Sequence, residues 1–273
     1  SKNVIKNNTM AEKVNQGIEL VKAGANVLGQ FYQDLAQPSV KALGQALATV
    51  FELCPNSLLS LKLWTEKRKL NFAKRLNEYK DKLEQIPEEK RCEVDTQIGT
   101  PIVEKLTYTT NDEIADLFTT LLANASNIDT VNRAHPAFVD IIGRLSEDEA
   151  RIIQYLRTAI EVPYCSFRAI TKNENGGFIT ILDHATMLPY YISLTFPQNI
   201  TAYLSNLISL GVLSDEDGLY KIDNTEYDNI CLKNGLDSLK AKLVPLSFKD
   251  IEVSKSYYKV TPFGKLFIDA CIK

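Results

Sequence analysis

Apolar residues recur at every third or fourth position along the first 156 residues, which predicts a series of amphipathic helices. The expected segments are a helix at 11–37, two apolar half-helices separated by Pro55 at 38–64, and a basic helix at 61–85. Pro87 is expected to end the basic helix, so residues 87–101 are predicted to form a linker.

Three short helices are predicted between Asp112 and Leu156. The run Asn-Ala-Ser-Asn at 124–127 ends the first of them. His135 is expected to cap the second, because Pro136 suits the first helical position and restricts the residue before it. Ser146 and Glu149 have the spacing of a capping box, which opens the third helix.

Alternating segments replace the helical period after Leu156. Strands are predicted at 167–170, 178–182, 219–222 and 257–261, with a turn at 173–177, and helices from Pro197 to Gly211 and from Pro262 onward. This order is similar to a winged-helix domain. The predicted fold is therefore mainly α, with a flexible N-terminus (1–10), a helical region (11–157) and an α+β winged-helix-like domain (158–273).

Three motifs resemble the abortive infection alpha family. They are Leu-Leu-Ala-Asn at 121–124, Ala-His-Pro-Ala-Phe-Val at 134–139 and Leu-Ser-Glu-Asp-Glu-Ala at 145–150. The resemblance extends from about Gln33 to about Leu156 and includes residues 86–89 and 98–101. It implies bacterial defence in which an infected cell stops growing or dies before phage spreads, without implying a reaction. Structural roles are expected for the motif residues His135, Pro136, Phe138, Ser146 and Glu149.

The charge is divided unevenly along the chain. Residues 1–92 contain 15 lysines and arginines against 10 acidic residues, a net +5, whereas residues 93–273 contain 16 against 24, a net −8, which together give −3. The basic part favours contact with an anionic surface, and the acidic part opposes it.

The composition is that of a soluble globular protein, with 45% hydrophobic and 24% charged residues. The five cysteines have no Cys-x-x-Cys spacing, so neither a disulfide framework nor a zinc site is expected. No signal peptide is recognised at the start of the sequence. We therefore expect a cytoplasmic protein, peripheral to the inner membrane if its basic part binds lipid.

The basic helix at 61–85 is the candidate contact for an anionic membrane or a phosphate backbone. The contact residues would be Trp64, Lys67, Arg68, Lys69, Lys74 and Arg75. The alternative is a solvated helix face stabilised by pairs such as Glu78 with Lys82. The half-helices at 38–64 are each too short to span a bilayer, and they would lie in its interface, form a hairpin or be buried.

The C-terminal domain is not expected to bind DNA. Its predicted recognition helix at 198–211 contains no lysine or arginine, and the following segment contains Asp215, Glu216 and Asp217. Such charges repel the phosphate backbone. We expect this domain to bind a protein, either a partner or a second copy of the chain.

Enzyme activity is not expected either. The only histidines are His135 and His184. For His135 a helix cap is favoured over a general base near Asp140, and His184 is placed in a strand-end turn. No nucleophile elbow, phosphate loop or zinc helix is present. We therefore expect no catalytic residue, metal, cofactor or small-molecule substrate.

The favoured function is that of a non-enzymatic abortive-infection protein that acts through protein contacts and, through its N-terminal helices, on a membrane. The alternative is a nucleic-acid-binding regulator that uses helix 61–85. A third hypothesis is a hydrolase in which His135 is the base.

Overall fold

The computed structural model describes residues 66–173, 176–244 and 248–273. These residues form two compact units. Unit 1 comprises the described residues up to 144 together with 270–273, and unit 2 comprises the described residues between 145 and 269. The helices expected at 11–37 and 38–64, and Trp64, lie outside the described residues.

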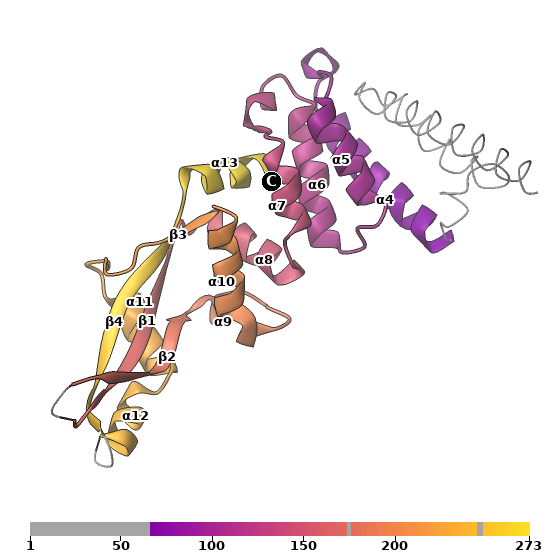
Figure 1. The fold of residues 1–273 in the computed structure, drawn as a ribbon. Coiled ribbons are helices and arrows are strands. Elements are labelled where there is room, and N and C mark those ends of the chain that lie inside the picture. Colours follow the sequence, from indigo (N-terminus) through magenta and orange to yellow (C-terminus); the bar gives the residue numbers. More distant parts are fainter. Residues whose placement is uncertain (1–65, 174–175, 245–247) are drawn as a thin grey trace, which may run out of the picture. The chain divides into compact units, whose positions relative to one another are not determined.

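Unit 1 is helical in its described part (Figure 1). Its elements are α4 (Glu66–Glu84), η1 (Glu88–Lys90), α5 (Thr96–Leu106), α6 (Asp112–Ala125), η2 (Val131–Arg133) and α7 (Ala137–Gly143). An apolar stripe along α4 and just after it is buried, and its members are Phe72, Leu76, Tyr79, Leu83 and Ile86. Hydrophobic burial of one face therefore holds α4 in the unit.

The prediction of a linker at 87–101 is wrong. The segment includes the first half of α5, which Asp95 caps by accepting a hydrogen bond from the Gln97 N–H at 2.7 Å. Pro101 lies inside this helix, where it removes one hydrogen bond. The helix persists because Ile98, Ile102 and Leu106 lie on one face and are buried.

Unit 2 contains a four-stranded antiparallel sheet in the order β2-β1-β4-β3 (Figure 1). The strands are β1 (Glu161–Thr171), β2 (Phe178–Thr186), β3 (Leu213–Asp215) and β4 (Phe248–Val260). The helices are α8 (Glu147–Leu156), α9 (Leu188–Tyr191), η3 (Pro197–Asn199), α10 (Ile200–Ser209), α11 (Thr225–Lys233) and α12 (Leu236–Leu243). Helix α13 (Pro262–Cys271) begins in unit 2, and its last residues belong to unit 1.

One face of the sheet packs on helices. Cys165, Phe167 and Ala169 of β1 form a buried cluster with Tyr227 and Ile230 of α11. These three β1 residues alternate along the strand, so they share a face. This cluster fixes the start of α11 over the sheet.

The fold is α+β, and the predicted hairpin, the helix after Pro197 and the helix from Pro262 are all present. The strand predicted at 219–222 is wrong. Its alternating pattern resembles a strand, but Gly218, at φ 80°, and the Leu219 N–H to Glu216 carbonyl hydrogen bond form a turn instead. Residues 219–222 therefore lie in the loop between β3 and α11.

Candidate binding pocket

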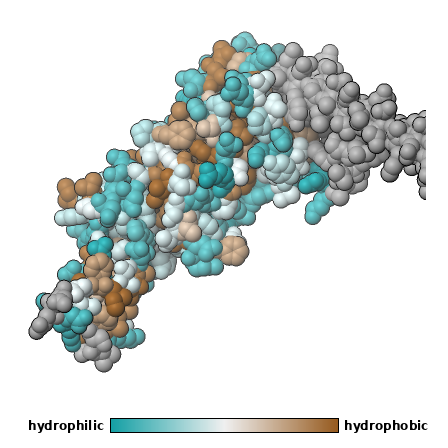
Figure 2. Space-filling view, viewed as in Figure 1, coloured by the Kyte–Doolittle hydropathy of each residue, from teal (hydrophilic) through white to brown (hydrophobic). Residues whose placement is uncertain are grey.

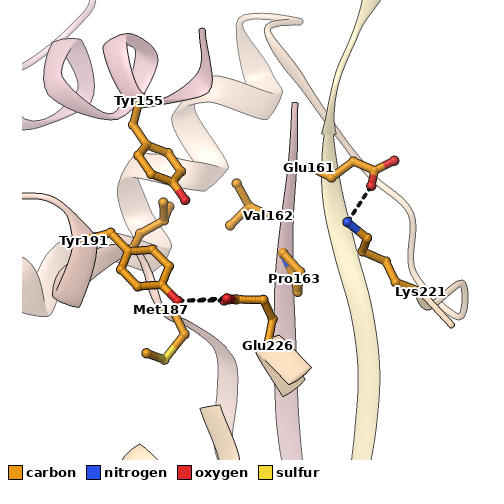
Figure 3. A pocket seen from close by; sticks show the side chains of 9 residues that line it. Tyr155, Glu161, Val162, Pro163, Met187, Tyr191, Lys221 and Glu226 are labelled. Carbon is orange, nitrogen blue, oxygen red and sulfur yellow. Dashed lines mark hydrogen bonds and ion pairs between the residues drawn. The ribbon is translucent and has the colours of Figure 1, made fainter. Parts of the chain in front are cut away.

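Unit 2 contains a pocket of about 170 Å³ between the end of α8, the start of β1, α9 and the start of α11 (Figure 3). Its lining residues are Tyr155, Glu161, Val162, Pro163, Met187, Leu188, Tyr191, Lys221 and Glu226. The lining thus combines two phenol rings, a small apolar floor and three charged side chains.

Two tyrosines form one wall of the pocket (Figure 3). The rings of Tyr155 and Tyr191 are 6.2 Å apart between centroids, with 24° between their planes. The Tyr191 hydroxyl donates to both carboxylate oxygens of Glu226, at 2.8 and 3.0 Å. The Tyr155 hydroxyl makes no hydrogen bond within the part of the chain that the structure describes.

Both phenols remain protonated near neutral pH. Burial, and then the hydrogen bond to Glu226, raise the pKa of Tyr191 to about 12. Burial, and then the nearby charge of Glu226, raise the pKa of Tyr155. Each side chain therefore adds a neutral hydroxyl and an aromatic ring to the pocket lining.

An ion pair forms the opposite side of the pocket. Lys221 Nζ lies 3.0 Å from Glu161 Oε2, and both side chains are partly exposed. Since Glu226 is the third charged group of the lining, the lining has one more carboxylate than ammonium. The pocket is therefore suited to a cation rather than to an anion.

The start of α8 holds the segment that follows α9. Ser146 and Glu149 form the predicted capping box, so this prediction is confirmed. Asp148, beside them, accepts hydrogen bonds from the Thr195 N–H at 2.7 Å, the Phe196 N–H at 2.9 Å and the Tyr203 hydroxyl at 2.9 Å. The helix cap is thus also a tertiary anchor, which the sequence did not indicate.

The sequence matches the family described as abortive infection alpha over residues 65–271, which include the pocket and the whole sheet. The chain belongs to this family. The match begins at residue 65 and extends through unit 2. The prediction that the resemblance runs from about Gln33 to about Leu156 is therefore wrong at both ends. In this family the sheet domain is part of the shared sequence.

Other known proteins add little to the family assignment. No curated protein matches the chain. One solved structure, the uncharacterized protein from the hydrocarbon-degrading marine bacterium Alcanivorax borkumensis SK2, is 14% identical, with a TM-score of 0.33. The similarity covers 50% of this chain and 93% of that chain.

The family motif around His135 has a local structural role. His135 Nδ1 accepts a hydrogen bond from the Ala137 N–H at 3.1 Å, which satisfies a donor at the start of α7. Pro136 already has helical angles, so the helix begins one residue earlier than its hydrogen-bond pattern suggests. Phe138 is fully buried, and its ring lies 5.6 Å from that of His135.

His184 lies in a β-bulge within β2 rather than in the strand-end turn that the sequence suggested. Asp183 and His184 together lie opposite the single residue Ser166 of β1. His184 has φ 51°, and among the described residues it is the only one besides glycines with a positive φ. Ser166 Oγ accepts the His184 N–H at 3.1 Å and donates to Asp183 at 2.9 Å, which stabilises the bulge.

The bulge places the His184 ring between polar partners. Its nitrogens lie 2.8 Å from Asp183 Oδ1 and 3.6 Å from Asp215 Oδ2, and its ring is 4.5 Å from the Tyr164 ring. Tyr164 in turn donates to Asp215 at 2.7 Å. Contacts within unit 2 therefore engage both nitrogens of this imidazole.

The structure separates the cations that the sequence grouped on α4. Lys67 and Arg68 are exposed, whereas Lys74 pairs with Asp112 at 2.8 Å. Trp64 and the side chain of Lys69 lie outside the described part of the chain. Arg75 is only 1% exposed, so it is not available at the surface, contrary to the expected contact set.

The Arg75 guanidinium fastens α4 to the start of α6. It donates to the Thr110 carbonyl at 2.8 Å, to Asp112 at 2.7 Å and to Glu78 at 2.9 Å. A planar guanidinium carries five N–H donors, so a single arginine can bond to all three acceptors. Arg75, which the sequence places among the surface cations of this helix, is thus part of the interior of unit 1.

Neither a membrane-spanning helix nor a metal-ion cluster is found in the described ranges. None of the helices in these ranges is both long and apolar enough to cross a membrane. Nor do residues 66–173, 176–244 and 248–273 contain a group of three or more His, Cys, Asp or Glu residues placed to hold a metal ion.

The sequence did not point to the pocket. Tyr155 lies in the third predicted helix and Lys221 in the strand predicted at 219–222, and the sequence pattern indicates no binding role for Tyr191 or Glu226. These residues come from four segments that only the folded sheet and its helices bring together. The one available signal was the acidic charge of this half of the chain.

Proposed function

We propose that this member of the abortive infection alpha family acts in defence by binding another protein through unit 2, without catalysing a reaction. The family supplies the abortive-infection context. The proposed mode of action rests on the surface of unit 2, and the setting we propose is the cytoplasm.

The observation that supports this proposal most directly is the loop between β3 and α11. It exposes Leu219 at 56%, Tyr220 at 64% and Ile222 at 97%. Hydrophobic atoms protrude on the left of Figure 2, where Figure 1 draws this loop. Single exposed apolar residues are common, but three within four positions suggest a surface that a partner covers.

The charges around this loop favour a protein over a nucleic acid. Residues 215–228 contain six acidic residues and one lysine, Lys221. Helix α10, which contains no lysine or arginine, precedes β3 as a recognition helix would precede a wing. The winged-helix comparison is therefore proposed as an architecture used for protein contact. On α4, the burial of Arg75 and the pairing of Lys74 weaken the nucleic-acid alternative.

The proposal that no reaction is catalysed rests on the histidines. His135 satisfies a helix end, and His184 is engaged by two aspartates and a tyrosine. These contacts to a backbone N–H, two carboxylates and a phenol ring give both imidazole rings a structural role, which supports the proposal.

The proposal also includes peripheral contact with an anionic membrane through α4. Leu70 is 61% exposed, and Lys67 and Arg68 near it are exposed too. An exposed apolar residue beside cations is typical of a helix that lies on a lipid surface.

We expect Ile222→Glu to abolish phage protection in bacteria that express the chain, because a charge would oppose burial against a partner. Ile128→Glu is the matched control, since Ile128 is 54% exposed in unit 1. Plating efficiency of phage measures protection. Melting temperatures of both variants should stay near that of the unmodified chain, since both side chains are exposed.

Equal protection by Ile222→Glu and by the unmodified chain would contradict the proposed use of this loop. Loss of protection in both variants to the same extent would contradict it as well. A protein that co-purifies with the unmodified chain but not with Ile222→Glu would support it.

A further inference from the structure

We propose that the pocket of unit 2 binds the guanidinium group of an arginine side chain on the partner protein. This inference rests on the proposed function, because it names the chemistry by which unit 2 would recognise its partner. It concerns the residues drawn in Figure 3.

The tyrosines provide the planar contact. Tyr155 and Tyr191 line the pocket with 6.2 Å between their ring centroids and 24° between their planes, and the Tyr191 ring is held in place by its hydrogen bonds to Glu226. A guanidinium is flat and weakly hydrated, so it stacks on aromatic rings more favourably than an ammonium does. The pocket volume of about 170 Å³ suits one side chain rather than a large ligand.

The carboxylate of Glu226 provides the directional contact. Its two oxygens accept from a single hydroxyl, and a carboxylate has about four acceptor positions, so capacity remains for a second donor group. Arginine fills such positions with two parallel N–H donors. The Tyr155 hydroxyl, which makes no hydrogen bond to the described residues, offers a further acceptor on the same wall.

The local charge selects a cation. The lining contains two carboxylates, those of Glu161 and Glu226, and a single lysine. That lysine, Lys221, is paired with Glu161 at 3.0 Å and so adds little positive potential. A phosphate or carboxylate ligand would meet repulsion here, whereas an arginine would be attracted.

The neighbouring loop explains why the arginine would belong to a protein. Lys221 lines the pocket, and its neighbours Tyr220 and Ile222 are exposed apolar residues. A partner that inserts an arginine would cover these residues with its adjoining surface. Interfaces often have this arrangement, in which a buried arginine anchor is surrounded by apolar contact.

The test uses the full chain and three labelled peptides with glycine and serine spacers. One peptide contains three arginines, one has lysines at the same positions, and one has glutamines. Fluorescence anisotropy at 50 mM and 150 mM salt reports binding. We expect the arginine peptide to bind about tenfold more tightly than the lysine peptide, as stacked and bidentate contacts are specific to arginine.

Variants locate the site. Glu226→Gln should weaken binding of the arginine peptide about tenfold, because it removes a charge-assisted hydrogen bond. Glu252→Gln is the control, since it makes the same charge change at an exposed position of β4. Tyr155→Leu should remove the preference for arginine over lysine while leaving the melting temperature nearly unchanged.

Equal binding of the arginine and lysine peptides, or equal effects of Glu226→Gln and Glu252→Gln, would overturn the inference, because attraction would then be general. Such a result together with loss of protection in Ile222→Glu would leave the proposed function standing. Arginine-specific binding that Glu226→Gln removes would support the inference whatever the result for Ile222→Glu.

Discussion

Asp148 shows how one carboxylate connects separate parts of unit 2. Its side chain is only 2% exposed, which alone would raise its pKa. Two backbone N–H groups and the Tyr203 hydroxyl donate to it and favour the ionised form, and the net effect is a lowered pKa. It also lies in the first turn of α8, where the helix dipole favours a negative charge.

We expect Asp148→Asn to lower the free energy of unfolding by about 2 kcal/mol at pH 7, because an amide leaves one donor without a proper acceptor. The lowered pKa means that the carboxylate stabilises the fold above its unfolded pKa of about 3.9, and that this contribution is lost as pH falls through the folded pKa. The difference between the two chains should therefore shrink below about pH 4.

Urea unfolding of both chains between pH 3 and pH 7 measures this difference. A difference that stays constant over the whole range would show that the charge of Asp148 does not contribute, and that only its shape and hydrogen bonds do.

At the scale of elements, the start of α13 packs closely against the chain that enters β3. Thr261 Oγ1 accepts the Gly264 N–H at 2.8 Å, and the Thr261 N–H donates to the Val212 carbonyl at 3.1 Å. A Cβ on Gly264 would lie 2.1 Å from the Val212 carbonyl oxygen. The helix can approach the backbone this closely only because residue 264 has no side chain.

Gly264→Ala should therefore destabilise unit 2 by about 3 kcal/mol, since backbone atoms must move. Gly143→Ala is the matched control. Its added Cβ would lie 3.4 Å from Lys105 Nζ, the end of a flexible side chain, and alanine favours a helix over glycine by up to about 1 kcal/mol. Thermal unfolding compares them, and equal melting temperatures would refute the close-approach explanation.

At the scale of the whole molecule, the charge division remains the basis for the membrane proposal. Residues 1–92 are net basic and the remainder is net acidic. Arg75 is buried and therefore adds no positive charge to the surface of α4, whereas Lys67 and Arg68 are exposed. Any attraction to anionic lipid should therefore depend on the start of α4 and on salt.

We expect the full chain to float with anionic phosphatidylglycerol vesicles at low salt, and less at 150 mM salt or with neutral phosphatidylcholine vesicles. The double variant Lys67→Glu, Arg68→Glu should lose most of this binding. Lys242→Glu with Lys249→Glu is the control, because both lysines are exposed in unit 2 and the charge change is the same. If the unmodified chain does not float, the membrane part of the proposal is wrong.

The sequence by itself determined the local elements and the family. The buried stripe of α4, the capping box of Ser146 and Glu149, and the hairpin of β1 and β2 all depend on residues that are close along the chain. Helix periods, caps and tight turns are decided by such neighbours. The motifs around His135 and Ser146 indicated the family correctly but not its extent.

Only the tertiary structure decided which strands pair, which charged side chains are buried and which apolar segments stay outside the sheet. Strand β1 pairs with β4, about ninety residues later, and this pairing builds the sheet beside the pocket. Arg75 is buried where the Thr109 and Thr110 carbonyls, between α5 and α6, accept its hydrogen bonds. Residues 219–222 lie outside the sheet because a turn directs them away. These outcomes depend on contacts between distant segments, which neither periodicity nor composition records.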